Sequence, residues 1–211
     1  MKFTQAGLFA KKVGMTQIFD ESGIALPVTI LKTEVCKISQ IKTVQKDGYD
    51  AIQVAYGKER FEKINKPIKG HLKKIGSQGF KYFGEFRVDT PDAFKLGQTL
   101  QLDMLSIGQT VRVTGKSIGK GFAGLQKRHN FSRGPMTHGS KNHRLPGSIG
   151  AGTTPGRGYP GKKMAGQLGG KQITIKNTEI LHLNSADNIL VLKGSLPGKK
   201  NTILKIQLEK N

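Results

Sequence analysis

The chain has 211 residues, of which 35 are Lys or Arg and 14 are Asp or Glu, giving a formal net charge of +21 at pH 7. This excess of positive charge favours a polyanionic partner, and no apolar run approaches the roughly 18 residues of a membrane-spanning helix, so we expect no membrane partner. The single Cys36 has no second cysteine to pair with and is predicted to be a half-buried strand thiol in a reducing compartment.

Short segments that alternate apolar and polar residues make up most of the chain, as antiparallel strands do. The first two are separated by Glu21-Ser22-Gly23, and the next two by a turn containing Asp47-Gly48, a strong hairpin signal. A short helix is predicted from Pro67 to Ile75. In chain order, strands are predicted at residues 16–20, 24–31, 34–44, 49–57, 80–88, 98–105, 110–118, 172–184, 188–194 and 202–209.

Many short strands joined by glycine turns predict a mainly β fold, either a small barrel or a sandwich. Residues 1–118 and 172–211 are expected to form this β domain, with a small helical insertion near residues 60–85. Residues 119–171 must leave the domain and return to it. A structureless loop of this length normally argues against such an assignment, but it is compatible with a loop that a partner orders.

From Met104 to Thr178 the sequence contains no Asp or Glu, although it carries thirteen Lys or Arg, sixteen of the 28 Gly and half of the eight Pro. Such a segment has too few apolar residues to form its own core and no acidic groups to neutralise its charge. A dense phosphate backbone can supply both the order and the neutralisation.

The basic residues of this region are therefore the candidate RNA-binding residues. Phe122, Phe131 and Tyr159 lie among them and are suited to stacking on unpaired bases. The candidates are Lys116, Lys120, Lys127, Arg128, His129, Arg133, His138, Lys141, His143, Arg144, Arg157, Lys162, Lys163 and Lys171.

Two motif matches in this region point to nucleotide binding but lack the residues that such sites need. Residues 119–124 satisfy G-x-G-x-x-G, yet the next acidic residue is Glu179, too distant for the ribose contact of a dinucleotide site. Residues 156–163 resemble a phosphate-binding loop, but Lys163 stands where the metal-binding Ser or Thr is required. We expect no cofactor and no small-molecule substrate.

Metal binding and catalysis are also disfavoured. The histidines at 129, 138 and 143 lie in a basic setting that repels cations, far in sequence from Cys36. A catalytic site generally uses a positioned base with a carboxylate to orient it, and the region has no carboxylate. The chain is therefore predicted to hold no metal and not to be an enzyme.

Several blocks, in order along nearly the whole chain, resemble the universal ribosomal large-subunit protein L3 family in its bacterial or organellar form. These blocks are GLFAKKVGMTQIFDESG at residues 7–23, VTGKSIGKGFAG at 113–124, RLPGSIG at 144–150, and then TPGR and GKKMAGQLG. The resemblance implies a Greek-key β-barrel like that of translation factors, with a small α/β insertion and an extended basic loop.

The same resemblance implies a function. The protein would bind 23S-type ribosomal RNA, nucleate assembly of the large subunit, contact neighbouring ribosomal proteins, and extend its loop towards the peptidyl-transferase centre. Its location would be a bacterial cytoplasmic ribosome, or an organelle stroma or matrix. The alternative is a transient RNA chaperone or a translation-factor-like RNA-binding protein, because a small barrel with a basic loop also fits that class.

Overall fold

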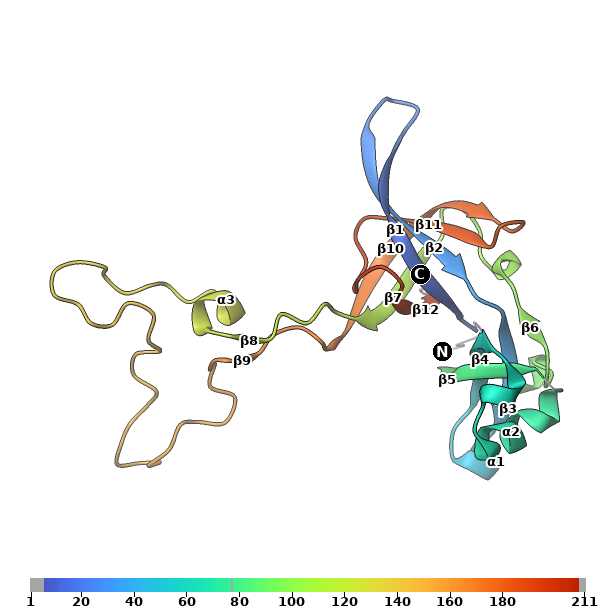
Figure 1. The fold of residues 1–211 in the computed structure, drawn as a ribbon, viewed down its shortest axis with the longest axis horizontal. Coiled ribbons are helices and arrows are strands. Elements are labelled where there is room, and N and C mark those ends of the chain that lie inside the picture. The colour runs from blue at the N-terminus through green and yellow to red at the C-terminus, as the bar shows by residue number, and fades with distance from the viewer. Residues whose placement is uncertain (1–5, 77, 209–211) are drawn as a thin grey trace. The chain divides into compact units, whose positions relative to one another are not determined.

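A computed structural model describes residues 6–76 and 78–208 of the chain (Figure 1). The fold is mainly β, as predicted. The chain divides into two compact units, one formed by Met1–Lys116 with Gln172–Asn211 and the other by Ser117–Lys171. We call the first the β unit and the second the basic unit. No helix in the described part of the chain has the length and apolar character to cross a membrane.

Six strands of the β unit close a barrel in the order β1, β12, β7, β10, β11, β2, and every neighbouring pair is antiparallel. Alternate residues point into the barrel, so Val111 and Val113 are buried on β7, and Leu204 and Ile206 on β12. The strands are β1 (Leu8–Phe19), β2 (Ala25–Thr33), β7 (Thr110–Lys116), β10 (Gln172–Asn184), β11 (Ile189–Lys193) and β12 (Ile203–Leu208).

A second sheet of four strands, in the order β5, β4, β3, β6, completes the β unit. Its strands are β3 (Cys36–Lys42), β4 (Ala51–Glu59), β5 (Gly79–Arg87) and β6 (Thr99–Leu100). The turn expected at Asp47-Gly48 contains the short helix α1 (Val44–Asp47), which ends at Gly48 with φ of 79°. Glycine adopts this left-handed conformation without a steric penalty.

Helical segments flank the second sheet. The helix predicted around Pro67 is α2 (Lys66–Leu72), which continues into the 3₁₀ turn η2 (Lys73–Ile75). Its Leu72 is fully buried and clusters with Phe80 of β5. Three further 3₁₀ turns are η1 (Phe61–Lys63), η3 (Pro91–Ala93) and η4 (Leu102–Met104).

The strand predicted at residues 98–105 is mostly wrong. Only Thr99–Leu100 is a strand, and the 3₁₀ turn η4 follows it at Leu102–Met104. Leu100, Leu102 and Leu105 are all buried. A turn, rather than a continuous extended strand, therefore brings the apolar side chains of this segment into the core. The amide of Leu105 donates to the carbonyl oxygen of Leu102 at 2.9 Å, which closes that turn.

Barrel and sheet share one hydrophobic core. Phe9 of β1 stacks on Tyr56 of β4 with ring centroids 3.8 Å apart, and Phe86 of β5 lies 5.1 Å from Phe9. Cys36 at the start of β3 is completely buried in the same core, rather than half-buried as an alternating strand position predicts. Burial raises the pKa of its thiol to about 11.

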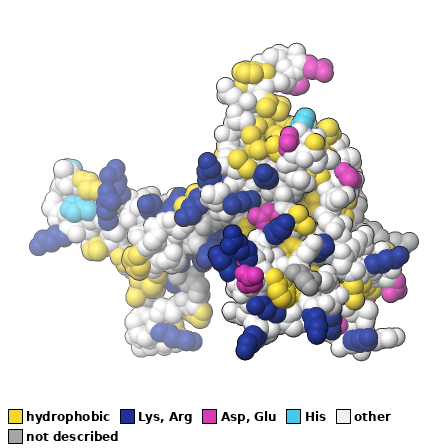
Figure 2. All heavy atoms as spheres, turned by 45° about the vertical axis from the view of Figure 1, so that its right-hand side comes forward, with side chains coloured by type: hydrophobic (Ala, Val, Ile, Leu, Met, Phe, Trp, Pro, Cys, Tyr) yellow, Lys and Arg dark blue, Asp and Glu magenta, His cyan; other side chains and the backbone are white. Residues whose placement is uncertain are grey.

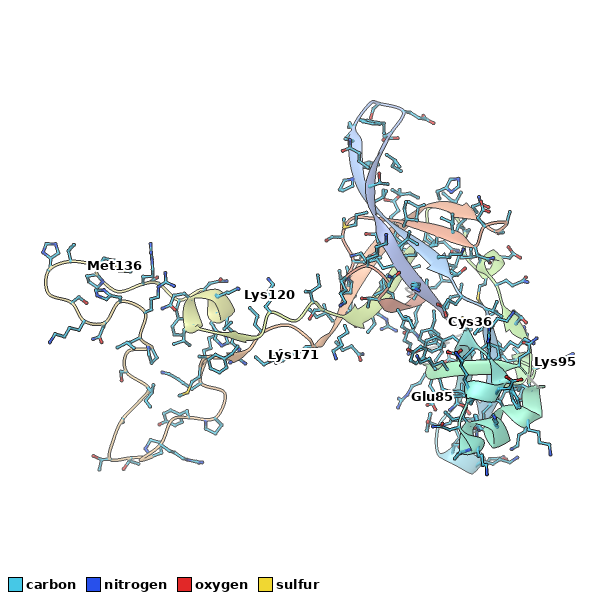
Figure 3. The ribbon with its side chains drawn as sticks, in the orientation of Figure 1. Cys36, Glu85, Lys95, Lys120, Met136 and Lys171 are labelled. Atoms are coloured by element: carbon cyan, nitrogen blue, oxygen red, sulfur yellow. The ribbon has the colours of Figure 1, made fainter. Side chains whose placement is uncertain are left out.

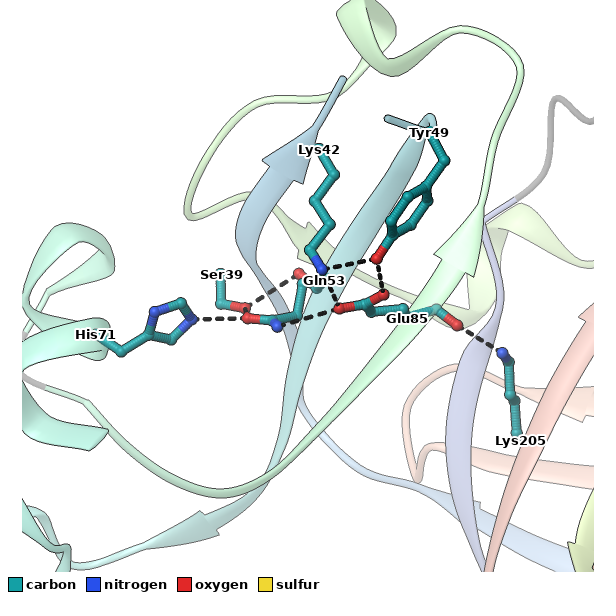
Figure 4. A network of polar contacts seen from close by, with 7 residues as sticks. All are labelled: Ser39, Lys42, Tyr49, Gln53, His71, Glu85 and Lys205. Atoms are coloured by element: carbon teal, nitrogen blue, oxygen red, sulfur yellow. Dashed lines mark hydrogen bonds and ion pairs between the residues drawn. The ribbon is translucent and has the colours of Figure 1, made fainter. Parts of the chain in front are cut away.

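A polar network on the second sheet centres on Glu85 (Figure 4). Its carboxylate accepts from Lys42 Nζ at 2.7 Å, from Tyr49 Oη at 2.8 Å and from Gln53 Nε2 at 3.4 Å. The bond from Lys42 is the main cause that lowers the pKa of Glu85. Lys205 of β12 donates to the backbone carbonyl of Glu85 at 2.5 Å, so the network also joins the sheet to the barrel.

Candidate nucleic-acid interface

The basic unit begins as a narrow antiparallel ribbon. Both the amide and the hydroxyl of Ser117 donate to the carbonyl oxygen of Lys171, at 2.9 and 3.1 Å. Further along, the amide of Lys120 donates to the carbonyl oxygen of Leu168 at 2.9 Å. The ribbon ends in the paired strands β8 (Phe122–Ala123) and β9 (Gly166–Gln167). In Figure 3, Lys120 and Lys171 mark the two segments of this ribbon.

One helical turn follows the ribbon. This helix, α3 (Leu125–His129), is followed by Asn130, whose φ of 57° is left-handed. The structure describes every residue from 117 to 171, and among them only Ala123 and Leu125 are buried apolar side chains. Two such side chains cannot form a hydrophobic core that would hold a segment of this length in shape.

Beyond α3 the chain makes a long irregular excursion before it returns at β9 (Figure 1). A few contacts cross its first part: the amide of Gly134 donates to the carbonyl oxygen of His143 at 3.0 Å, and Gln126 Nε2 donates to that of Arg144 at 3.2 Å. Residues 145–158 are all described and form no hydrogen bond with any described residue. Leu145 and Ile149 in this part are 61% and 46% exposed.

The structure separates the candidate residues into two groups. Arg128 and His129 are partly buried on α3, and both contact the carbonyl oxygen of Met164, with Nε2 of His129 at 3.1 Å. They connect the outgoing and returning segments of the basic unit. The other candidates are exposed: Lys116, Lys120, Lys127, Arg133, His138, Lys141, His143, Arg144, Arg157, Lys162, Lys163 and Lys171.

No acidic side chain lies within residues 117–171 to neutralise these cations. The first acidic residue after the acid-free stretch, Glu179, already pairs with Lys193 at 3.0 Å. Figure 2 shows the Lys and Arg side chains along the basic unit on one face of the molecule. The surface of this unit is therefore positively charged along its length, as a binding site for phosphates requires.

Comparison with known proteins identifies the family. Residues 86–188 match the model of the family described as Ribosomal protein L3. The chain is 65% identical over 201 residues to the large ribosomal subunit protein uL3c of Emiliania huxleyi, covering 95% of this chain and 97% of that protein. It is 59% identical over 200 residues to uL3c of Phaeodactylum tricornutum, with 95% and 97% covered. The chain belongs to the ribosomal protein L3 family.

The likeness extends to bacterial members of the L3 family. The uL3 protein of Prochlorococcus marinus strain MIT 9312 is 52% identical over 201 residues, covering 95% of this chain and 93% of that protein. Both the organellar and the bacterial forms that the sequence resembles are thus represented among its relatives.

The aromatic residues of this L3 chain differ in their availability. Phe122 is 79% exposed and Tyr159 is 63% exposed, so both rings are free to stack on bases. Phe131 is partly buried, and its ring centroid lies 6.2 Å from that of His129. We infer that Phe131 supports α3 rather than presenting its ring to a partner.

The two nucleotide-binding motif matches of this L3 chain lie in different parts of the basic unit. Residues 119–124 form one side of the ribbon and the N-terminal cap of α3, and residues 156–163 lie in the irregular excursion. Nowhere in the described part of the chain are three or more His, Cys, Asp or Glu grouped so as to hold a metal ion. His143 Nδ1 instead lies 2.9 Å from the carbonyl oxygen of Pro135.

Sequence reasoning left Lys176 out of the candidate list. It lies on β10, is exposed, and falls within the acid-free stretch. Its position in that stretch is the sequence signal that identifies it as a candidate. Arg112 also falls in that stretch, but it lies on β7 and donates to Gln207 Oε1 at 3.1 Å. Lys176 is therefore a further candidate cation, whereas Arg112 is not.

Proposed function

We propose that this L3-family chain is a structural constituent of the large ribosomal subunit that binds 23S-type ribosomal RNA through its basic unit. One observation carries the proposal: residues 117–171 have many cations, no carboxylate and two buried apolar side chains. Such a segment can hold a single shape only when a partner supplies the missing contacts. RNA supplies both phosphates for the cations and base faces for Phe122 and Tyr159.

The mechanism is neutralisation of crowded phosphates. Each exposed Lys or Arg that contacts a phosphate releases condensed counterions, which steepens the dependence of log K on log salt by about 0.9 for duplex and about 0.7 for single strands. No reacting group is required, so the chain is proposed to act as a binding protein and not as an enzyme.

The composition of the excursion suits a path between packed RNA helices. Pro146 and Pro155 limit the conformations that the free chain must give up on binding. The small residues Ser148, Ala151 and Gly152 are all exposed and lie in the part without hydrogen bonds, where the chain is narrow. We propose that this part reaches towards the peptidyl-transferase centre and influences peptide-bond formation only through the shape of the RNA.

The β unit is proposed to be a Greek-key barrel of the translation-protein type, placed on the subunit surface, where it contacts neighbouring ribosomal proteins. Assembly would begin when the basic unit folds onto RNA and fixes the barrel against it. Relatives named uL3c and uL3 match over nearly the whole chain, which supports the proposal that the ribosome is that of an organelle or of a bacterium.

The test is sedimentation through a high-salt sucrose gradient. A fixed ribosomal constituent stays with the large subunit, whereas the transient RNA chaperone or translation-factor-like alternative is released at moderate salt. Crosslinking in cells, followed by mapping of RNA attached to residues 128–163, gives the second measurement. Fragments from one region of 23S-type RNA support the proposal, and fragments scattered over many transcripts would contradict it.

A further inference from the structure

The outer part of the β1–β2 hairpin, residues 13–31, has a charge opposite to that of the chain as a whole. From Val13 to Leu31 there is no Lys or Arg, although the chain has 35 of them, and the hairpin carries Asp20 and Glu21. This is the longest stretch without a basic residue. A surface of net charge −2 in a protein of net charge +21 does not suit contact with RNA phosphates.

The outer part of this hairpin extends past the barrel (Figure 1). Strand β12 pairs with β1 only over Leu8–Lys11, and β11 pairs with β2 only over Val28–Lys32. Residues 17–19 and 25–27 therefore pair only with each other among the described strands. A two-stranded ribbon is marginally stable by itself in water, and it is stabilised when one face packs against something else.

The ribbon presents apolar side chains to solvent. Phe19 is 67% exposed, Ile24 is 60% exposed and Met15 is 49% exposed. Figure 2 shows hydrophobic and acidic side chains on this protruding hairpin. Grouped exposed apolar residues with a charged rim are typical of a protein–protein contact.

The turn at the tip is well ordered by hydrogen bonds. The amide of Gly23 donates to the carbonyl oxygen of Asp20 at 2.8 Å, and the amide of Asp20 donates to that of Ile24 at 3.0 Å. The amide of Glu21 donates to Asp20 Oδ1 at 2.8 Å. Both acidic side chains are exposed at this turn, between the exposed apolar residues Phe19 and Ile24 in the sequence.

We propose that residues 13–27 form a docking surface for a basic ribosomal protein of the same large subunit. The partner has an apolar patch that covers Met15, Phe19 and Ile24, and Lys or Arg side chains that face Asp20 and Glu21. Its charge follows from complementarity, because the acidic tip attracts cations and repels phosphates. This inference rests on the proposed function, since it needs the chain to be part of the subunit.

The experiment places a photo-crosslinking amino acid at Phe19 in the full chain within assembled large subunits, with the same probe at Lys171 as the control. We expect the probe at 19 to crosslink to one protein of high pI from the salt-washed subunit, and the probe at 171 to crosslink to RNA. Crosslinks from position 19 to RNA, or to no molecule, would overturn the inference. Absence of the chain from the subunits would instead overturn the proposed function.

A neutralising variant tests the charge argument. Asp20→Asn with Glu21→Gln keeps an acceptor at position 20, and we expect it to lower the protein crosslink from position 19 several-fold. The matched control is Glu62→Gln with Asp92→Asn, which removes the same charge from two exposed acids elsewhere and should leave the yield unchanged. An unchanged yield in the hairpin variant would refute docking by a basic partner. Crosslinking to RNA from position 19 of the chain that retains both acidic residues would refute it too.

Discussion

Gly169 lies directly against the carbonyl oxygen of Ile118, where a Cβ atom would come within 2.0 Å of that oxygen. Its φ of 69° is also in the left-handed region, which side chains other than glycine rarely adopt. The two segments of the ribbon can therefore approach one another at this point only because residue 169 has no side chain.

Replacing Gly169 with Ala is expected to open the ribbon. Strain from the left-handed backbone alone is about 1–3 kcal/mol. Exchange of the Lys120 and Leu168 amides, which bond across the ribbon, should accelerate about tenfold or more, measured by hydrogen exchange in the full chain. Gly119→Ala is the control because a Cβ there meets nothing within 4 Å. Equal exchange in both variants would contradict the close-approach argument.

Lys127 and Arg128 are neighbours with different expected roles. The Lys127 side chain is exposed and forms no hydrogen bond or ion pair with any described residue, whereas the Arg128 side chain donates to the carbonyl oxygen of Met164. Lys127→Ala should weaken RNA binding and lower the salt slope by about 0.7–0.9, which corresponds to one phosphate contact. The measurement is RNA affinity as a function of salt concentration.

Arg128→Ala should weaken binding by more than Lys127→Ala does, because it loosens the link between α3 and the returning segment. Arg128→Lys retains the charge but not the geometry of the guanidinium group, so it should rescue the affinity only in part. Full rescue by Lys would indicate that Arg128 acts through its charge alone.

The strand pattern of the β unit could be predicted because apolar residues alternate over long segments. Two segments are exceptions. Strand β1 begins at Leu8, eight residues before the predicted strand. At residues 98–105, Leu100, Leu102 and Met104 have strand-like spacing, but the chain turns at Leu102–Met104 and buries Leu105 as well. Alternation reports which residues are buried and does not report the backbone path, since a short 3₁₀ turn can bury nearly the same positions.

In the basic unit the charge was readable from the sequence, whereas its internal structure was not. The ribbon and α3 rest on backbone hydrogen bonds and on the burial of Ala123 and Leu125, which leave little periodic signal in a glycine-rich segment. The bond from Arg128 to Met164 joins residues far apart in sequence, so no local pattern predicts it. For this reason the sequence alone does not distinguish the role of Arg128 from that of Lys127.

Glu85 is expected to stabilise the β unit in a pH-dependent manner. Its bond from Lys42 lowers its pKa from the ordinary value of 4.5, so its contribution is present above that pH and is lost as the pH falls through the lowered pKa. Glu85→Gln should lower the melting temperature at pH 7 by about 2–4 °C. The difference from the unmodified chain should shrink as Glu85 becomes protonated. Glu62→Gln is the exposed control, and a pH-independent difference would contradict this role.

The Cys36 thiol is expected to be unreactive in the folded chain. Its pKa is raised from 9.0 to about 11, so at pH 8 its thiolate fraction is about 100-fold below that of an unfolded thiol. Because the folded state favours the neutral thiol, stability is retained below pH 9 and falls as the pH rises towards 11. Alkylation rates check this, with Val35→Cys in a Cys36→Ala background as the exposed control. Equal rates for the two thiols would contradict it.

The dependence of the basic unit on RNA is tested most directly by hydrogen exchange of residues 145–158, compared between the free full chain and the assembled large subunit. These residues have no hydrogen bonds among the described residues. In the free chain their amides should exchange close to the rate of an unfolded chain while those of β1 and β7 remain protected, and in the subunit the same amides should become protected. Protection of residues 145–158 in the RNA-free chain equal to that of the barrel strands would contradict the account.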